Sequence, residues 1–201
     1  MPVLETARLR LRTLRLDDAA DQQAFASESE VAGPGMWDPL PTLEENRRDL
    51  MEALESQARG ETAEWGIEHQ SEGRLIGRCG FLRFRPAHRN AELGYALSRP
   101  YWRQGYMSEA VAAVLAFGFD RLDLQRVEAN CLADNTASCR LLEKAGFALE
   151  GTARQAYVQD GISKDLHRYA VLRHEFTSSP ASPTGATRSA TEYRPGSAGP
   201  R

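Results

Sequence analysis

The chain has 201 residues, of which 41% are hydrophobic and 26% charged, a balance typical of one soluble globular domain. Its net charge of −3 gives no reason to expect nucleic acid as a partner. No stretch approaches the roughly 18 consecutive apolar residues of a membrane-spanning helix, so we expect no membrane association.

The first part of the chain predicts one strand and two helices. Alternating charged and apolar residues predict a half-buried strand over residues 8–16, whose arginines are interpreted as a solvated face. Asp17 and Asp18 supply the cap of a helix to about residue 27, and the segment 33–35 (GPG) is interpreted as a turn. Thr42 and Glu45 have the spacing of a capping box, which begins a helix over about 43–59.

The rest of the domain alternates strands with two helices. Strands are predicted over 65–69, 75–81 and 90–98, the first two joined by a hairpin turn at 71–73. A helix with a core-facing apolar stripe follows Gly105, and a second one is capped by Asn135 and ended by Gly146. Further strands are predicted over 126–132, 147–150, 153–159 and 166–173. The order indicates a mixed α/β fold in which an antiparallel meander leads into a βαβ-like half.

We assign this domain to residues 1–176 and predict that 177–201 is a disordered tail, because its Ser-, Pro-, Thr- and Gly-rich composition cannot bury enough apolar surface. The three cysteines and four histidines show no metal-ligand spacing, so no metal is expected. The N-terminal residues lack the apolar run of a secretory signal. A reduced, cytoplasmic location is therefore the expectation.

The segment 102–110 (WRQGYMSEA) carries the most informative functional signal. It follows a strand and turns directly into a helix, with Gly105 at the junction. A glycine lets the backbone approach a ligand closely, and the unpaired N–H groups of a helix N-terminus favour an anion. The segment therefore predicts a phosphate site, although it has neither a Walker lysine nor the glycine pattern of a dinucleotide-binding loop.

Four motifs in the same order and spacing resemble the GNAT family of N-acetyltransferases, particularly the branch that acetylates ribosomal-protein N-termini (RimJ/RimL type). They are residues 91–95 (AELGY), the loop at 102–110, residues 134–138 (DNTAS) and residues 143–147 (EKAGF). The resemblance covers about residues 3–174. It implies a mixed α/β GNAT fold, with a central, mostly antiparallel and splayed sheet of about seven strands flanked by helices.

The resemblance also implies which residues bind acetyl-CoA. The loop would hold the diphosphate, whereas Asn135 and the edge of the splayed strand would contact the pantetheine arm. The implied residues are Leu97, Ser98, Arg103, Gln104, Gly105, Tyr106, Met107, Ser108 and Asn135. Met107 departs from the small residue that the family has there, although the expected contact is through the backbone. Arg103 could instead be a solvated loop residue, and Asn135 an ordinary helix cap.

Two side chains are predicted to serve the reaction itself. A primary amine must lose a proton when it attacks a thioester carbonyl. Glu92, a carboxylate in an otherwise apolar strand, is the predicted base, and the alternative is an outward-facing strand residue. Ser138 matches a serine that acts as the acid in the ribosomal branch, and the alternative is a helix serine bonded to the preceding turn.

The resemblance thus predicts an acetyl-CoA-dependent N-acetyltransferase that works by direct attack of the acceptor amine. The expected acceptor is a protein N-terminus of the ribosomal type. The alternatives are a small-molecule amine, such as an antibiotic, and a non-catalytic acyl-CoA-binding module. We expect a monomer or a homodimer.

Overall fold

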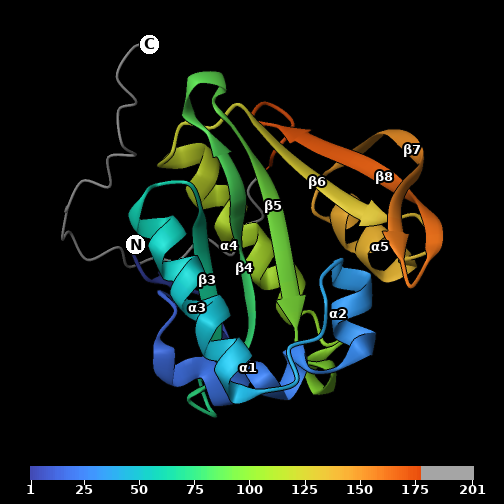
Figure 1. The fold of residues 1–201 in the computed structure, drawn as a ribbon. Coiled ribbons are helices and arrows are strands. Elements are labelled where there is room, and N and C mark those ends of the chain that lie inside the picture. The colour runs from blue at the N-terminus through green and yellow to red at the C-terminus, as the bar shows by residue number, and fades with distance from the viewer. Residues whose placement is uncertain (178–201) are drawn as a thin grey trace.

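The computed structural model describes residues 1–177, so the predicted tail, apart from Thr177, lies outside the described residues. Eight strands form one sheet in the order β1-β2-β3-β4-β5-β6-β8-β7 (Figure 1). The strands are β1 (Leu4–Glu5), β2 (Leu9–Arg12), β3 (Ala63–His69), β4 (Arg74–Arg85), β5 (Asn90–Leu97), β6 (Arg126–Leu132), β7 (Ala148–Gln159) and β8 (Ile162–Leu172). The helices are α1 (Ala19–Ala26), α2 (Ser29–Gly35), α3 (Leu43–Ala58), α4 (Tyr106–Asp120) and α5 (Thr136–Lys144).

Helices cover both faces of the sheet, which confirms the predicted mixed α/β architecture. Figure 1 shows α1 and α3 in front of the sheet and α4 behind it. α5 follows β6 and packs against β6 and β7. Among residues 1–177, no helix combines the length and the apolar character needed to span a membrane.

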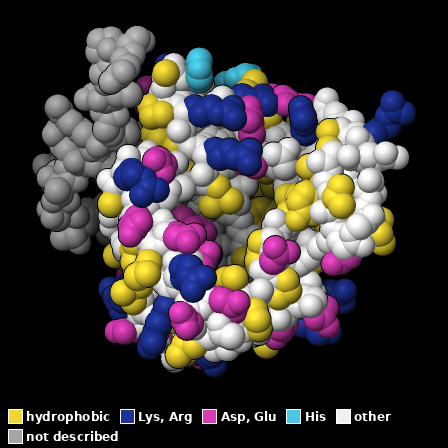
Figure 2. Space-filling model, in the orientation of Figure 1, with side chains coloured by type: hydrophobic (Ala, Val, Ile, Leu, Met, Phe, Trp, Pro, Cys, Tyr) yellow, Lys and Arg dark blue, Asp and Glu magenta, His cyan; other side chains and the backbone are white. Residues whose placement is uncertain are grey.

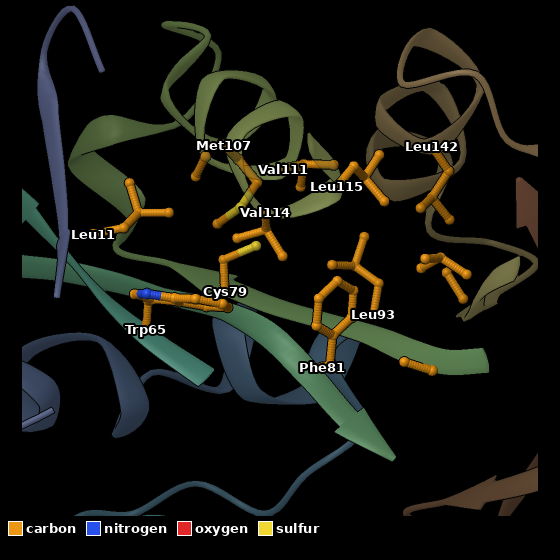
Figure 3. Packing of buried hydrophobic residues seen from close by; sticks show 14 of the residues in the cluster. Leu11, Trp65, Cys79, Phe81, Leu93, Met107, Val111, Val114, Leu115 and Leu142 are labelled. Atoms are coloured by element: carbon orange, nitrogen blue, oxygen red, sulfur yellow. The ribbon is translucent and has the colours of Figure 1, made fainter. Parts of the chain in front are cut away.

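The main core lies between α4 and the sheet (Figure 3). The predicted apolar stripe of α4 is confirmed, since Val111, Val114 and Leu115 are fully buried. They face strand residues that include Trp65 and Phe81, which are also fully buried. Trp65 therefore belongs to the core, and its indole N–H donates a 2.9 Å hydrogen bond to the carbonyl of Pro2.

The sheet opens between β5 and β6, the fifth and sixth strands in its order. All other neighbours pair antiparallel, but β5 and β6 are parallel because α4 connects them. They pair only at their N-terminal ends, from Asn90 opposite Arg126 to Glu92 opposite Glu128. Beyond Glu92 the two strands separate, which is the predicted splay (Figure 1).

The predicted strand over 8–16 is shorter, β2 at Leu9–Arg12, and two further segments also differ from the prediction. The predicted turn at 33–35 is the end of α2. Pro34 has no N–H to bond the carbonyl of Glu30, so the helix stops one residue later and Met36 turns into the left-handed region at φ 64°. The predicted strands at 147–150 and 153–159 are one strand, β7, because two register shifts against β8 absorb the irregular residues.

The N-terminal arginines are also not one solvated face. Arg12 is buried, and its guanidinium donates to both carboxylate oxygens of Asp18, at 2.7 and 2.8 Å, and to Glu68 on β3. A buried guanidinium requires such partners, because an unpaired charge in the interior is costly. Arg12 therefore joins the first helical segment to the sheet.

Candidate active site

Glu92 lies where β5 and β6 begin to separate. Its carboxylate accepts a 3.1 Å hydrogen bond from the side-chain amide of Asn130 on β6 and lies 3.0 Å from the guanidinium of Arg83 on β4. The Glu92 side chain is only 17% exposed. Side chains from both neighbouring strands thus hold the predicted base at the apex of the opening.

The direction of Glu92 follows from strand alternation. Ala91 and Leu93 point into the α4 core, so Glu92 points to the opposite face, the one flanked by α1 and α3. Figure 2 views that face and shows a hollow at its centre, with hydrophobic and acidic side chains around it and Lys or Arg side chains above it. An acceptor entering from this face would meet the Glu92 carboxylate.

The predicted phosphate loop joins a short 3-10 turn to the N-terminus of α4. Gly105 caps the helix with φ 84°, a left-handed conformation that costs glycine little. The first intrahelical bond runs from the N–H of Glu109 to the carbonyl of Gly105 at 3.0 Å. The N–H groups of Tyr106, Met107 and Ser108 precede it and are not used by the helix. The positive end of α4 is therefore available to an anion.

Leu97 and Ser98 end β5 beside this loop, with their backbones turned in opposite directions. The N–H of Ser98 donates to the carbonyl of Ile76 on β4 at 2.8 Å, so it is used within the sheet. Because alternate residues of a strand bond to opposite neighbours, the polar groups of Leu97 face the opening. The Leu97 carbonyl accepts a 2.7 Å bond from the indole of Trp102. We therefore expect the backbone N–H of Leu97 to be the group on β5 that can donate a hydrogen bond into the opening.

Asn135 caps α5, as predicted. Its side-chain oxygen accepts from the N–H of Ser138 at 3.1 Å, and its amide nitrogen donates to the carbonyl of Pro34 on α2 at 3.3 Å. The bond to Pro34 connects α5 to α2. The pantetheine contact of Asn135 remains a prediction.

Ser138 makes a contact that the sequence does not foretell. Its hydroxyl lies 2.7 Å from the phenol oxygen of Tyr95 on β5. Tyr95 stands inside the 91–95 motif, but strand alternation alone does not say that its side chain reaches α5. Asn130 was likewise not foreseen, because its bond to Glu92 depends on the register of β6 against β5.

Arg8 is a further site residue that sequence reasoning missed. Its Nη1 donates to the carbonyl of Gln104 at 2.9 Å, its Nε donates to Glu109 at 2.8 Å, and its guanidinium carbon lies 4.2 Å from the centre of the Tyr106 ring. Burial alone would raise the pKa of Glu109, but bonds from Thr6 and Arg8 outweigh it and lower that pKa. Arg8 thus connects the start of β2 to the predicted phosphate loop.

This contact predicts that Arg8→Ala loosens the loop. We expect the KM for acetyl-CoA to rise three- to tenfold and the free energy of unfolding to fall by about 1 kcal/mol, because the bonds to Gln104 and Glu109 are lost. Arg10→Ala is the matched control, since Arg10 pairs only with the exposed Glu5, at 3.0 Å, within residues 1–177. Both KM values would be measured by steady-state kinetics. The same KM for acetyl-CoA in Arg8→Ala and Arg10→Ala would contradict the role of Arg8.

The structure also bears on metal binding and on an acyl-cysteine intermediate. Within residues 1–177, no three His, Cys, Asp or Glu side chains lie close enough together to hold a metal ion. Cys131 is buried, its sulfur lies 3.5 Å from that of Cys139, and burial together with this contact raises the pKa of Cys131 to about 12. Its thiolate is therefore scarce at neutral pH, which disfavours an acyl-cysteine intermediate on this residue.

Comparisons with known proteins agree with this geometry. Residues 8–148 match the model of the acetyltransferase (GNAT) domain. The uncharacterized N-acetyltransferase YoaA of Bacillus subtilis is 37% identical over 174 residues, which are 86% of this chain and 97% of that protein. The ribosomal-protein-serine acetyltransferase of Escherichia coli is 33% identical over 99 residues, covering 49% of this chain and 55% of that protein.

A solved structure shares the whole fold. The GNAT-family acetyltransferase from Bacillus anthracis superposes with a TM-score of 0.77 at 26% identity, covering 87% of this chain and 100% of that one. This superposition supports the predicted GNAT fold. The chain therefore belongs to the GNAT family of acetyltransferases and is an N-acetyltransferase.

Proposed function

We propose that the protein transfers the acetyl group of acetyl-CoA directly to the α-amine of a protein N-terminus of the ribosomal type. The observation that carries this proposal is the position of Glu92, whose carboxylate lies at the apex of the opening between β5 and β6. The N-terminus of α4 follows the other end of β5. A donor bound along the opening would thus have its diphosphate at one end and its thioester toward the carboxylate.

The residues present fit such a donor. The backbone from Arg103 to Ser108 would cradle the diphosphate, with the dipole of α4 behind it. The N–H of Leu97 would pair with the pantetheine arm as an added strand does, and Asn135 would contact the same arm once it releases Pro34. When bound, acetyl-CoA supplies the activated acetyl group, and the protein supplies orientation and proton transfer.

Glu92 would accept the proton that the amine loses. An α-amine has an unperturbed pKa of about 7.7–8.0 and is substantially neutral near pH 7.5, whereas a lysine with a pKa of about 10.4 is neutral about once in a thousand molecules. An α-amine therefore needs only a modest base, directly or through one water. The Glu92 carboxylate at the apex is suited to that acceptor.

Ser138 would serve the leaving group from the α5 side of the opening. A thiol with a pKa of about 8.5 leaves readily as a thiolate, so a hydrogen bond is enough and full protonation is not required. We therefore expect Ser138→Ala to lower turnover much less than the loss of the base.

The partial match to the ribosomal-protein-serine acetyltransferase supports the N-terminal acceptor. The test is release of CoA thiol from acetyl-CoA in the presence of N-terminal peptides or of small amines. We expect turnover with peptides that begin with Ser or Ala, and at least tenfold less with the same peptides blocked at the α-amine but carrying a free lysine. Turnover with polyamines or aminoglycosides and none with peptides would replace this acceptor by a small molecule.

A further inference from the structure

Tyr95 is a half-buried tyrosine on β5 that none of the roles above uses. Its oxygen lies 2.7 Å from the hydroxyl oxygen of Ser138. β5 is one side of the opening, and α5, which carries Ser138, packs against β6 on the other side. The hydrogen bond between the two hydroxyls therefore crosses from one side of the opening to the other.

The direction of this hydrogen bond decides what Ser138 can do. Each hydroxyl has one proton to donate. Burial raises the pKa of Tyr95, so the phenol keeps its proton. A donor shielded from water is destabilising when it lacks an acceptor, and within residues 1–177 the half-buried phenol of Tyr95 lies beside the Ser138 oxygen. If Tyr95 donates, the Ser138 oxygen acts as the acceptor, and the Ser138 proton, which otherwise faces the Cys131 sulfur, can be donated to the sulfur of a bound donor.

We infer that Tyr95 is a positioning residue, which donates to Ser138 and thereby directs the Ser138 proton at the sulfur of the bound donor. This inference rests on the proposed function, because it requires the thioester to lie between β5 and β6. The side-chain oxygen of Asn135 supports the same orientation, because it accepts a 3.1 Å hydrogen bond from the backbone N–H of Ser138. Ser138 is thus fixed at its backbone and at its oxygen.

The step balances without a proton leaving Tyr95. The amine nitrogen forms a bond to the acetyl carbon, and the carbon–sulfur bond breaks with its electron pair remaining on sulfur. The amine proton goes to Glu92, and the Ser138 hydroxyl stabilises the thiolate by a hydrogen bond. A thiol with a pKa of about 8.5 is a far stronger acid than a buried phenol, so transfer of a proton from Tyr95 to the thiolate would be uphill.

The first test is a double-mutant cycle with Tyr95→Phe, Ser138→Ala and the combined variant. Tyr95→Phe removes one oxygen and keeps the ring. We expect it to lower kcat three- to tenfold and to leave the KM for acetyl-CoA within twofold. When Ser138 is already Ala, we expect Tyr95→Phe to lower kcat by less than a further 1.5-fold, because the two hydroxyls act as a unit. If Tyr95→Phe lowered kcat by the same factor in the unmodified protein and in Ser138→Ala, the inference would be overturned.

Tyr169→Phe is the matched control for the loss of a phenol that contacts α5. Tyr169 lies on β8 and donates to Glu143, also on α5, at 3.2 Å. We expect its kcat to stay within twofold of the unmodified protein. A loss equal to that of Tyr95→Phe would mean that both phenols act only by holding α5 in place, and the positioning role would be wrong.

A second measurement needs no acceptor and so separates this inference from the proposed function. The pKa of the thiol of bound CoA can be followed by the ultraviolet absorbance of its thiolate. We expect this pKa to rise in Tyr95→Phe and in Ser138→Ala, and to be unchanged in Tyr169→Phe. An unchanged thiol pKa in Tyr95→Phe would refute the role of Tyr95. If no amine were acetylated, the proposed function would be wrong. The titration of the CoA thiol would still decide whether Tyr95 positions Ser138.

Discussion

Replacing Glu92 by Gln is expected to lower kcat about a hundredfold while CoA binds with unchanged affinity. A positioned general base contributes typically 10²–10⁴-fold, and glutamine has nearly the same shape but cannot accept the amine proton. The side chain points to the acceptor face, away from the α4 core, so the residues expected to hold the donor are not disturbed. Steady-state kinetics with the best peptide and calorimetry with CoA would measure the two effects separately.

Glu128→Gln is the control for this experiment. Glu128 lies directly opposite Glu92 on β6, carries the same charge and is bonded to Arg126 at 2.9 Å. We expect its kcat to fall less than threefold. A similar loss in both variants would mean that the negative charge of this region matters rather than proton acceptance by Glu92. Turnover in Glu92→Gln within twofold of the unmodified protein would show that the base lies elsewhere.

Substituting Gly105 by Ala is expected to raise the KM for acetyl-CoA about tenfold with little change in kcat. A residue with a Cβ at φ 84° is strained by roughly 1–2 kcal/mol, and that Cβ would lie 3.4 Å from a guanidinium nitrogen of Arg8. The loop would relieve the strain by shifting the amides that are proposed to hold the diphosphate. Loss of binding without loss of chemistry appears as a raised KM.

Gly73→Ala separates this effect from strain in general. Gly73 lies in the turn between β3 and β4 at φ 64°, and a Cβ there meets no atom within 4 Å. Both substitutions should lower the free energy of unfolding by about the same amount, measured by denaturant titration. Only Gly105→Ala should raise the KM. An equal KM in the two variants would argue against the loop as the diphosphate site.

Local signals in the sequence predicted several helix ends, although α2 was missed and the Asp18 carboxylate accepts from the N–H of Arg15 and does not cap α1. The Thr42 capping box is present in full, with the hydroxyl accepting from the Glu45 N–H at 3.2 Å and the Glu45 carboxylate accepting from the Thr42 N–H at 2.9 Å. Asn135 and Gly105 also occupy the cap positions expected of them. Each of these features depends on residues at most three or four positions apart, and so does not require knowledge of the fold.

Contacts between distant segments were not predictable in the same way. The alternation in the sequence predicts that Arg12 lies on a solvated face. In the structure Arg12 is buried, and its guanidinium donates hydrogen bonds to Glu68 and Asp18. The same strand brings Arg8 to the phosphate loop, 101 positions from Glu109. Periodicity says which face of a strand a side chain occupies, and not which segment covers that face. These two arginines therefore had the same local signal and different roles.

The sequence by itself determined the order of the elements, the helix caps, the loop at 102–110 and, through four motifs in register, the GNAT family. Only the tertiary structure decided that Asn130 and Arg83 contact Glu92, and that Tyr95 reaches Ser138. The physical reason is that these contacts depend on strand register and on the separation of β5 from β6. Register is set by the pairing of whole strands, and a shift of one residue would turn each side chain to the opposite face.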